Sequence, residues 1–570
     1  MKRCPECGRE YDNTMSFCLD DGAELLYGPA SADEPATAIL SEPGAVAIGF
    51  RASESPTRAQ IHTTEQTAVL PNGTGDVSAK PRGLDKRLSA VPFLVAIIVL
   101  GGFFGYRYFS SLSPKQIESI AVMPFVNESG STDLDYLSDG MTETLISSLS
   151  QLPTLNVKPR SLVFRYKGKE TNPQNLGSEL GVQAVLNGSV VQRGNDLSLF
   201  VELIDVASTK VIWSQRYNRK QSDIVSLQSE IARDVSSKLK AGLTDADQKK
   251  VTKNSTDNPE AYRLYLLGNS LAARRKTKDL QMALDDYQQA IALDPNYALA
   301  YTGLAAAHTF MALYGGIPGA EELPKARAAA MKALEIDPNL AEAHNILGGV
   351  ELFLGHDFQA IERETQRALE LNPNLANAHR HNGIRLAWLG HFDEAIVSLR
   401  RSLELDPLAL PTNINYAWCL FYAGRIAESD AQIKVTQEID PSFWFIEYQL
   451  FRNSRAKSDY AAAVEHLARA QELRDEPDAA RFIRDAFKSG GWTGFMKAAI
   501  AEPGRSKVWD YYLASFAVEL GDKDKAFALL DRAYERYDQF ILFLKIDPSM
   551  DSLRSDARFN ELLKKLGFPQ

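Results

Sequence analysis

The sequence has little cysteine and no excess of basic residues. Only four cysteines occur in 570 residues, which excludes a scaffold held together by disulfides. Lys and Arg together number 63 against 73 Asp and Glu, for a formal net charge of −10. An acidic chain is a poor candidate for binding nucleic acid over its whole length, so we expect nucleic acid to be an unlikely partner.

Motifs of catalysis are also missing. The sequence contains neither a GxxxxGK[ST] phosphate loop nor a GxGxxG fingerprint. The segment 119–240 has no His or Cys that could support nucleophilic chemistry. His344 and His379 lie 35 residues apart, the spacing of a repeat found below, and do not suggest a metal cluster. We therefore predict that the protein is not an enzyme and has no small-molecule substrate.

Three of the four cysteines fall in the first eighteen residues. Cys4 and Cys7 stand in a CPECG turn, and Cys18 begins the related stretch CLDDG, in which Asp21 takes the place of the second thiol. Residues 1–26 resemble short bacterial zinc ribbons that read CPxCG and then FCxxDG. That resemblance implies a structural zinc ion held by Cys4, Cys7, Cys18 and Asp21, with Asp20 as the alternative fourth ligand. Reduced thiols imply a cytoplasmic position.

A spacer and an uncharged stretch follow. Residues 27–87 are rich in Ala, Pro, Ser, Thr and Gly without a sustained apolar period, which predicts a disordered linker. No charge occurs from Leu88 to Tyr106, and a helix of that length spans about 28 Å, close to the thickness of a bilayer core. We predict a single transmembrane helix at 88–109. More Lys and Arg precede it than follow it, so the positive-inside rule predicts a bacterial inner-membrane protein with a cytoplasmic N-terminus and periplasmic or extracytoplasmic C-terminal domains.

Strand and helix patterns alternate in residues 115–245. Apolar runs at 119–125, 155–158, 184–192, 197–205 and 211–217 predict strands, with a hairpin turn at Gly194-Asn195-Asp196, while 134–152 and 224–239 have helical periods. These patterns predict an α/β domain. The stretches IAVMPF (120–125), YLSDGMTE (136–143), LGSELGV (176–182) and LNGSV (186–190) resemble the amino-terminal domain of TolB. In proteins with that domain, it usually lies between a signalling module and helical repeats.

A period of 34 or 35 residues runs through residues 259–441, except for a first interval of 43 residues from Pro295 to Pro338 that contains the inserted turn GGIPG (315–319). Pro338, Pro373, Pro407 and Pro441 each follow an Asp or Asn, at intervals of 35, 34 and 34 residues. Such pairs end helices, since the residue before a proline avoids the helical conformation. Five residues before each of these prolines, and before Pro295, stands a small or hydroxyl-bearing residue that would let paired helices approach closely: Ala290, Ala333, Ala368, Ser402 and Thr436. A lone hairpin cannot bury its apolar face, so the units must stack into a solenoid.

This unit resembles the tetratricopeptide repeat. The solenoid is expected over 259–570, most clearly over 259–441, with a C-terminal cap at about 540–570. The resemblance implies that peptides bind along a concave face of the array. The equivalent repeat positions in this sequence assign a binding groove to Asn345, Arg380, Ile384, Trp418 and Phe421. The chain is therefore predicted to be multidomain: a small zinc ribbon, a single transmembrane helix, an α/β domain and a C-terminal α-helical tetratricopeptide-repeat solenoid.

Two functions remain open from the sequence. The first is a membrane-anchored interaction scaffold that binds a protein or peptide partner through its repeats, with the zinc ribbon as a cytoplasmic adaptor. The second is a regulator linked to signalling or transcription that acts through the ribbon. Acidic residues outnumber Lys2, Arg3 and Arg9 in the ribbon, which disfavours contact with nucleic acid.

Overall fold

The computed structural model describes residues 2–3, 10–11, 117–131, 134–169, 171–239, 244, 255–314, 317, 319–353 and 357–569. The chain divides into two compact units, Met1–Gly101 and Gly102–Gln570. In the first unit, strand β1 (Lys2–Arg3) pairs antiparallel with β2 (Glu10–Tyr11). The predicted zinc ligands Cys4, Cys7, Cys18 and Asp21 and the predicted linker at 27–87 lie outside the described residues, so both stay predictions.

The predicted location in the inner membrane is corrected by the described helices. No helix within the described ranges is long and apolar enough to cross a membrane. The 25-residue helix α19 (Pro477–Ala501), for example, contains Arg481, Arg484 and Lys488, and charges within a span are costly in a bilayer. The stretch 88–109, where the transmembrane helix was predicted, lies outside the described residues. The predicted sidedness depended on that span, and it is withdrawn together with the membrane location.

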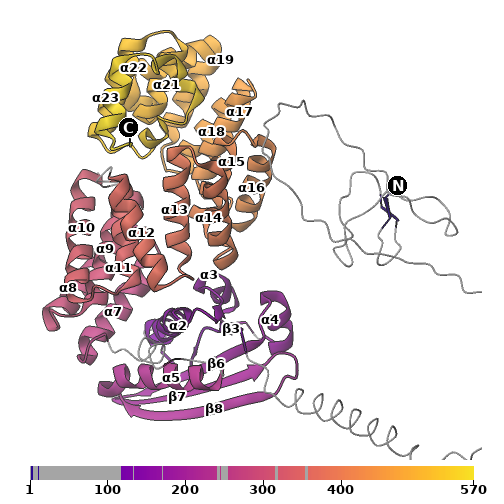
Figure 1. The fold of residues 1–570 in the computed structure, drawn as a ribbon, viewed down its shortest axis with the longest axis vertical. Helices are drawn as coiled ribbons and strands as arrows, with labels where there is room; N and C mark the ends of the chain where they lie inside the picture. Colours follow the sequence, from indigo (N-terminus) through magenta and orange to yellow (C-terminus); the bar gives the residue numbers. More distant parts are fainter. Residues whose placement is uncertain are drawn as a thin grey trace, which may run out of the picture. The chain divides into compact units, whose positions relative to one another are not determined.

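The segment from 119 to 238 forms a small α/β domain with a mixed sheet. Its strands are β3 (Ser119–Val122), β4 (Val126–Asn127), β5 (Asn156–Val157), β6 (Ala184–Arg193), β7 (Asp196–Asp205) and β8 (Val211–Lys220). The sheet order is β5-β3-β6-β7-β8, and β4 also pairs with β6. β3 runs parallel to β5 and β6, whereas β6, β7 and β8 form an antiparallel meander that Figure 1 shows as three long arrows.

Helices α2 (Asp135–Ser150) and α5 (Ile224–Lys238) share one apolar core with the sheet. The predicted strands and both of these helices are present, which confirms the mixed α/β pattern. The sequence reading missed α3 (Arg160–Val163) and α4 (Pro173–Leu180). Helix α4 had readable signals, since Asn172 caps its start by accepting from the Gln174 amide and Gly181 ends it at φ 60°.

From Pro259 onward the chain is helical and folds into stacked hairpins (Figure 1). The paired helices are α7 (Pro259–Ala272) with α8 (Thr277–Leu293), α9 (Ala298–Tyr314) with α10 (Gly319–Ile336), α11 (Ala341–Phe353) with α12 (Phe358–Leu371), α13 (Ala376–Leu389) with α14 (Phe392–Leu405), α15 (Leu410–Tyr422) with α16 (Ile426–Ile439), and α17 (Phe445–Ala456) with α18 (Tyr460–Glu472). The first helix of each hairpin also packs on the first helix of the next, as α11 does on α13, α13 on α15 and α15 on α17. This arrangement forms one continuous row of inner helices.

The Asp-Pro and Asn-Pro pairs end the helices as the sequence predicts. Asp294, Asn372 and Asp406 each follow the last helical residue and adopt extended backbone angles near φ −140° and ψ 90°. The small residues set five positions before the prolines are fully buried between helices: Ala290, Ala333, Ala368, Ser402 and Thr436. Close approach of paired helices therefore repeats at equivalent positions along the array.

The recurring histidines also have a structural role. The ring Nε2 of His344 lies 3.0 Å from the Pro338 carbonyl oxygen, and that of His379 lies 2.9 Å from the Pro373 oxygen. In the next unit, Asn413 donates to the Pro407 oxygen at 2.9 Å. These side chains satisfy the carbonyl groups left free where a helix has ended.

The C-terminal end departs from the repeat. Helix α19 contains a kink at Gly491, and the short α20 (Pro503–Ser506) follows it. Next come α21 (Asp510–Glu519) and α22 (Lys523–Glu535), then the 3₁₀ turns η4 (Ile541–Phe543) and η5 (Pro548–Leu553), and α23 (Ala557–Lys565). Apolar residues of this end share one core with α13, α15 and α17. The end of the chain therefore folds back onto the inner helices.

Candidate functional site

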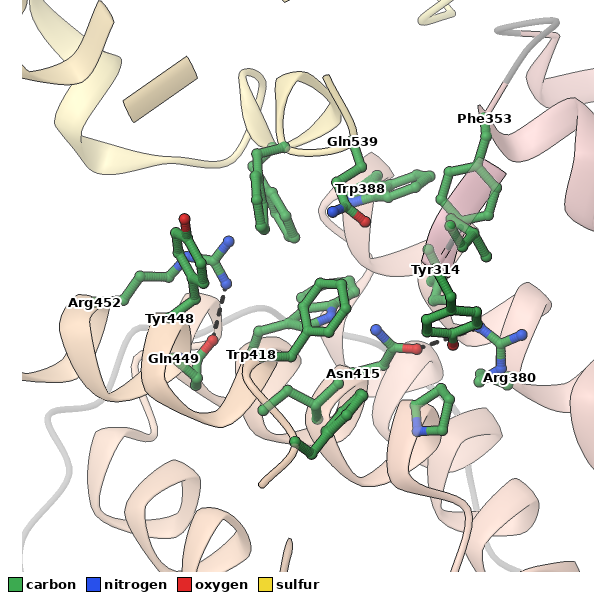
Figure 2. A pocket seen from close by; sticks show the side chains of 18 residues that line it. Tyr314, Phe353, Arg380, Trp388, Asn415, Trp418, Tyr448, Gln449, Arg452 and Gln539 are labelled. Atoms are coloured by element: carbon green, nitrogen blue, oxygen red, sulfur yellow. Dashed lines mark hydrogen bonds between the residues drawn. The ribbon is translucent and has the colours of Figure 1, made fainter. Parts of the chain in front are cut away.

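A cavity of about 100 Å³ lies between the inner helices α13, α15 and α17 and the turn at residues 539–543 (Figure 2). Each helix supplies one face, because its lining residues recur every three or four positions. The lining residues are Arg380, Ile384 and Trp388 on α13; Pro411, Ile414, Asn415 and Trp418 on α15; Phe445, Tyr448, Gln449 and Arg452 on α17; Gln539, Phe540 and Phe543 from the turn; and Leu313, Tyr314, Phe353 and Phe443 beside them.

Nine of the eighteen lining residues carry aromatic rings. Trp388 and Trp418 stack at 6.4 Å between ring centroids with 12° between their planes. Phe543 from the C-terminal turn meets Trp418 edge-on at 4.9 Å and stacks on Tyr422 at 5.1 Å. Such a wall offers a large apolar surface and rigid rings, which are the usual anchors for a partner's side chain.

Two arginines are placed among these rings. Arg452 is 8% exposed, and its guanidinium lies over Phe543 at 4.6 Å and over Phe540 at 5.2 Å. Arg380 is half-buried, and burial lowers the pKa of its guanidinium to about 10, so it stays charged at neutral pH. In the view of Figure 2 the two arginines lie on opposite sides of Trp418.

The five groove residues named from the sequence have different positions. Arg380, Ile384 and Trp418 all line the cavity. Asn345 lies on α11, 7% exposed, and Phe421 lies on α15 with its ring edge-on to Tyr422 at 5.1 Å. Neither Asn345 nor Phe421 is among the lining residues. The assignment of a binding groove to these five residues stays a prediction.

Sequence reasoning missed Trp388 and Arg452. Trp388 follows Arg380 and Ile384 at the same spacing of four residues, so a helical wheel of α13 would have found it. Arg452 lies after Pro441, where the repeat motif is weak. Its position therefore could not be aligned with equivalent positions of the earlier repeats. The turn at 539–543 lies about 90 residues further along than Arg452, and no local pattern signals that contact.

The remaining cysteine is part of the packing. Cys419 is fully buried on α15, and burial raises the pKa of its thiol to about 12. The thiol is therefore protonated at neutral pH and unreactive, which confirms its interpretation as a small buried apolar residue. Among the described residues, no group of three or more His, Cys, Asp or Glu side chains is arranged to hold a metal ion.

Two family models match parts of the chain. Residues 115–234 match the second domain of HilA/YgeH-like transcriptional regulators, and residues 272–309 match the TPR repeat. The C-terminal half carries tetratricopeptide repeats. The match of the α/β domain is to the HilA/YgeH model, and its resemblance to TolB stays a prediction.

Curated relatives resemble parts of the chain. "Putative adenylate cyclase 3" of Rhizobium meliloti is 30% identical over 231 residues, which cover 40% of this chain and 39% of the relative. "Transcriptional regulator HilA" of Salmonella typhimurium is 23% identical over 373 residues, 63% of this chain and 58% of the relative. The chain therefore spans 39% of the length of the first relative and 58% of the length of the second.

Solved structures of repeat proteins are also similar. PilW, a type IV pilus biogenesis factor, matches with a TM-score of 0.31 and 22% identity over 37% of this chain and 92% of its own. YrrB, described as a TPR protein with an unusual peptide-binding site, matches with a TM-score of 0.25 and 22% identity over 35% of this chain and 97% of its own.

Proposed function

We propose that the protein is a non-enzymatic interaction scaffold whose repeat array binds a segment of a protein partner in the cavity between α13, α15 and α17. The observation that carries the proposal is the cavity itself: three successive inner helices each present one face to it, and half of its lining residues are aromatic. A volume of about 100 Å³ suits one small side chain or the end of a longer one, since it is below the roughly 150 Å³ of a cavity that holds a benzene ring.

Site-specific photocrosslinking tests this proposal. The photoreactive residue p-benzoylphenylalanine replaces Phe353, a partly exposed ring in the cavity lining. The matched control carries it at Val397, which is 68% exposed on α14 and is not a lining residue. We expect irradiation of the full chain in its source cells to join a defined protein to position 353 and not to position 397.

A second substitution links the adduct to the cavity. In the chain that carries the probe at 353, Ile384→Ala removes an apolar part of the wall and should weaken the crosslink without unfolding the array. Equal adducts at 353 and 397, or an adduct at 353 that Ile384→Ala leaves unchanged, would contradict the proposal.

A second candidate function is a regulator linked to signalling or transcription. The match of residues 115–234 to a domain of HilA/YgeH-like transcriptional regulators favours it. In that case the repeats would bind a signal or partner, and the N-terminal ribbon would act on the target. Nucleic acid crosslinked to the full chain, and lost when residues 1–26 are removed, would support this function; a protein adduct that needs only the repeats would support the scaffold.

We also propose that Cys4, Cys7, Cys18 and Asp21 hold a structural zinc ion. Three thiolates and one carboxylate supply the four ligands that zinc prefers. Strands β1 and β2 support the proposal, because they pair on either side of the CPECG stretch. Elemental analysis of the full chain should find one zinc ion per chain, with weaker retention in Asp21→Ala. Equal zinc retention in both proteins would remove Asp21 as a ligand.

A further inference from the structure

Arg452 is buried without a carboxylate partner. Its Nη1 donates to Gln449 Oε1 at 2.9 Å, while its Nε and Nη2 are buried and have no hydrogen-bond partner. Within the described part of the chain it forms no ion pair. Burial lowers the pKa of Arg452, while Tyr512, Tyr422 and Asp547 raise it and leave the pKa above its usual value. Asp547 Oδ2 accepts from the Tyr511 hydroxyl at 2.8 Å. Buried charges are normally paired and hydrogen-bonded, so this arginine is an exception that calls for an explanation.

A neighbouring arginine shows the usual solution. Arg455, one turn further along α17, also lies over aromatic rings, at 5.9 Å from Trp492 and 5.5 Å from Phe516. Its Nη2 nevertheless donates to Glu519 Oε2 at 2.8 Å, and its Nη1 donates to Ser515 at 2.9 Å. Arg455 therefore has a carboxylate partner in addition to its contacts with the rings. The difference between the two arginines is that Arg452 faces the cavity.

Other cavity donors are unused as well. The indole Nε1 of Trp388, a residue only 3% exposed, is buried and has no partner. Arg380 reaches only neutral acceptors, among them His381 Nε2 at 2.8 Å. Indole and guanidinium nitrogens donate and never accept. The residues that line the cavity thus include buried donors without partners and positive charge, set among aromatic rings.

We infer that the cavity binds a carboxylate side chain carried by an otherwise apolar segment of the partner. This inference rests on the proposed scaffold function and names the chemistry of the segment bound. The carboxylate accepts from Arg452 and from Trp388, and the rest of the segment packs on Trp418 and Phe543. Charge-assisted hydrogen bonds of this kind are about twice as strong as neutral ones, and the surrounding rings exclude water that would weaken them.

The test uses a small probe that carries both a carboxylate and an apolar ring. The full chain is titrated with 3-phenylpropionate, which joins a ring to a carboxylate, and with its neutral amide, 3-phenylpropanamide. The readout is the indole N–H resonances of the six tryptophans, with Trp388→Phe identifying the resonance of Trp388. We expect the acid to move that resonance downfield and to bind at least about tenfold more tightly than the amide, as a charged hydrogen bond predicts.

Variants locate the effect. Arg452→Met removes the charge and should abolish the preference for the acid. The matched control is Arg474→Met: Arg474 also donates Nη1 to a glutamine three residues earlier, at 3.0 Å, and lies over Trp444 and Trp509, but it does not line the cavity. It should keep the preference. Because the comparison of acid with amide needs only the unaltered chain, a misfolded Arg452→Met protein would not prevent the test.

Several results would overturn the inference. These are equal affinity for acid and amide, absence of binding by the acid, a preference that survives Arg452→Met, and tighter binding of phenyl phosphate, which would indicate a phosphorylated partner instead. The proposed function fails separately: a partner crosslinked at position 353 with no preference for acid would sink only this inference. A preference for acid without any partner adduct would contradict the scaffold and the partner segment, and would leave only the affinity of the cavity for carboxylates.

Discussion

The early and late hairpins of the array are packed by different side chains. Around α9, α10 and α11 the buried cluster consists of Ala305, Ala329, Ala330 and Leu347. From α13 to the C-terminus the core is dominated by rings, including Trp418, Tyr448, Phe495, Phe516 and Phe540. Small residues let helices approach closely, whereas rings bury a large apolar surface in offset-stacked or edge-on contacts. The candidate cavity lies on the aromatic side, where rings and unused donors meet.

The largest loss of stability is expected from a substitution in the aromatic half of the array. Phe516 is fully buried and packs edge-on to Phe451, Trp492 and Phe495. Phe516→Ala should lower the free energy of unfolding by about 3–5 kcal/mol, since it removes apolar contacts and leaves a cavity. Chemical denaturation followed by circular dichroism measures this. Phe421→Ala, at a partly exposed ring outside that core, should cost much less; equal losses would remove the distinction between core rings and surface rings.

Asp538 should make the aromatic half sensitive to pH. It is 3% exposed just before the turn at 539–543, and burial raises the pKa of its carboxyl to about 7, although the Tyr511 and Phe540 amides donate to it. Because this pKa lies above that of the unfolded chain, its contribution to stability is complete below about pH 4 and is lost as the pH rises through about 7.

Asp538→Asn isolates that contribution. The amide oxygen can still accept from one of the two backbone groups, which donate to different oxygens of Asp538, and the amide does not ionise. The loss of the other hydrogen bond lowers stability by an amount that does not depend on pH. Between pH 4 and pH 8 the stability of the unaltered chain should therefore fall relative to the variant, by roughly 4 kcal/mol at most. Thermal melts of both proteins across that range measure the difference. Parallel pH profiles would show that Asp538 does not titrate with folding.

In the alanine-packed half, stability should fall when a side-chain atom is added and not only when one is removed. Gly268 and Gly303 lie against Tyr287, whose hydroxyl donates to Asn269 at 2.7 Å. A Cβ at Gly303 would lie 2.5 Å from the Tyr287 ring, so Gly303→Ala should destabilise the chain by about 1–3 kcal/mol. Gly490→Ala is the matched control, because no atom lies within 4 Å of the added Cβ; it should be neutral or stabilise by about 0.5–1 kcal/mol. Equal melting points for the two variants would contradict close packing at Gly303.

The smallest effect is expected on the outer helices in either half. Arg401 and Glu404 on α14 form an ion pair at 2.9 Å with both side chains largely exposed. Water screens such pairs, so Glu404→Ala should change the free energy of unfolding by no more than about 0.5 kcal/mol. A larger loss would mean that surface charge contributes to the stability of the array.

The sequence predicts those features that depend on local rules. Helix ends at Leu293, Leu371 and Leu405 follow from proline's restriction of the preceding residue, and the buried small positions follow from the period. The strands of the α/β domain follow from alternation of apolar and polar residues. Arg380, Ile384 and Trp418 were reachable because register with one repeat extends to the next.

The remainder depends on contacts that no period encodes. Phe543 contacts Trp418 although more than 120 residues separate them in the sequence. Arg452 could be recognised as a candidate binding residue only from the rings and donors that surround it in the fold. The predicted membrane location was inferred from one apolar stretch at 88–109, and it is corrected because no described helix is long and apolar enough to cross a membrane.

The central claim is that a partner segment enters the cavity between α13, α15 and α17. Hydrogen exchange of the full chain, measured by mass spectrometry with and without the partner identified by crosslinking, tests it most directly. The account predicts slower exchange in residues 376–389, 410–422 and 445–456 and at the turn 539–543 when the partner is bound. Protection confined to the α/β domain at 119–238, with no change in those inner helices, would contradict it.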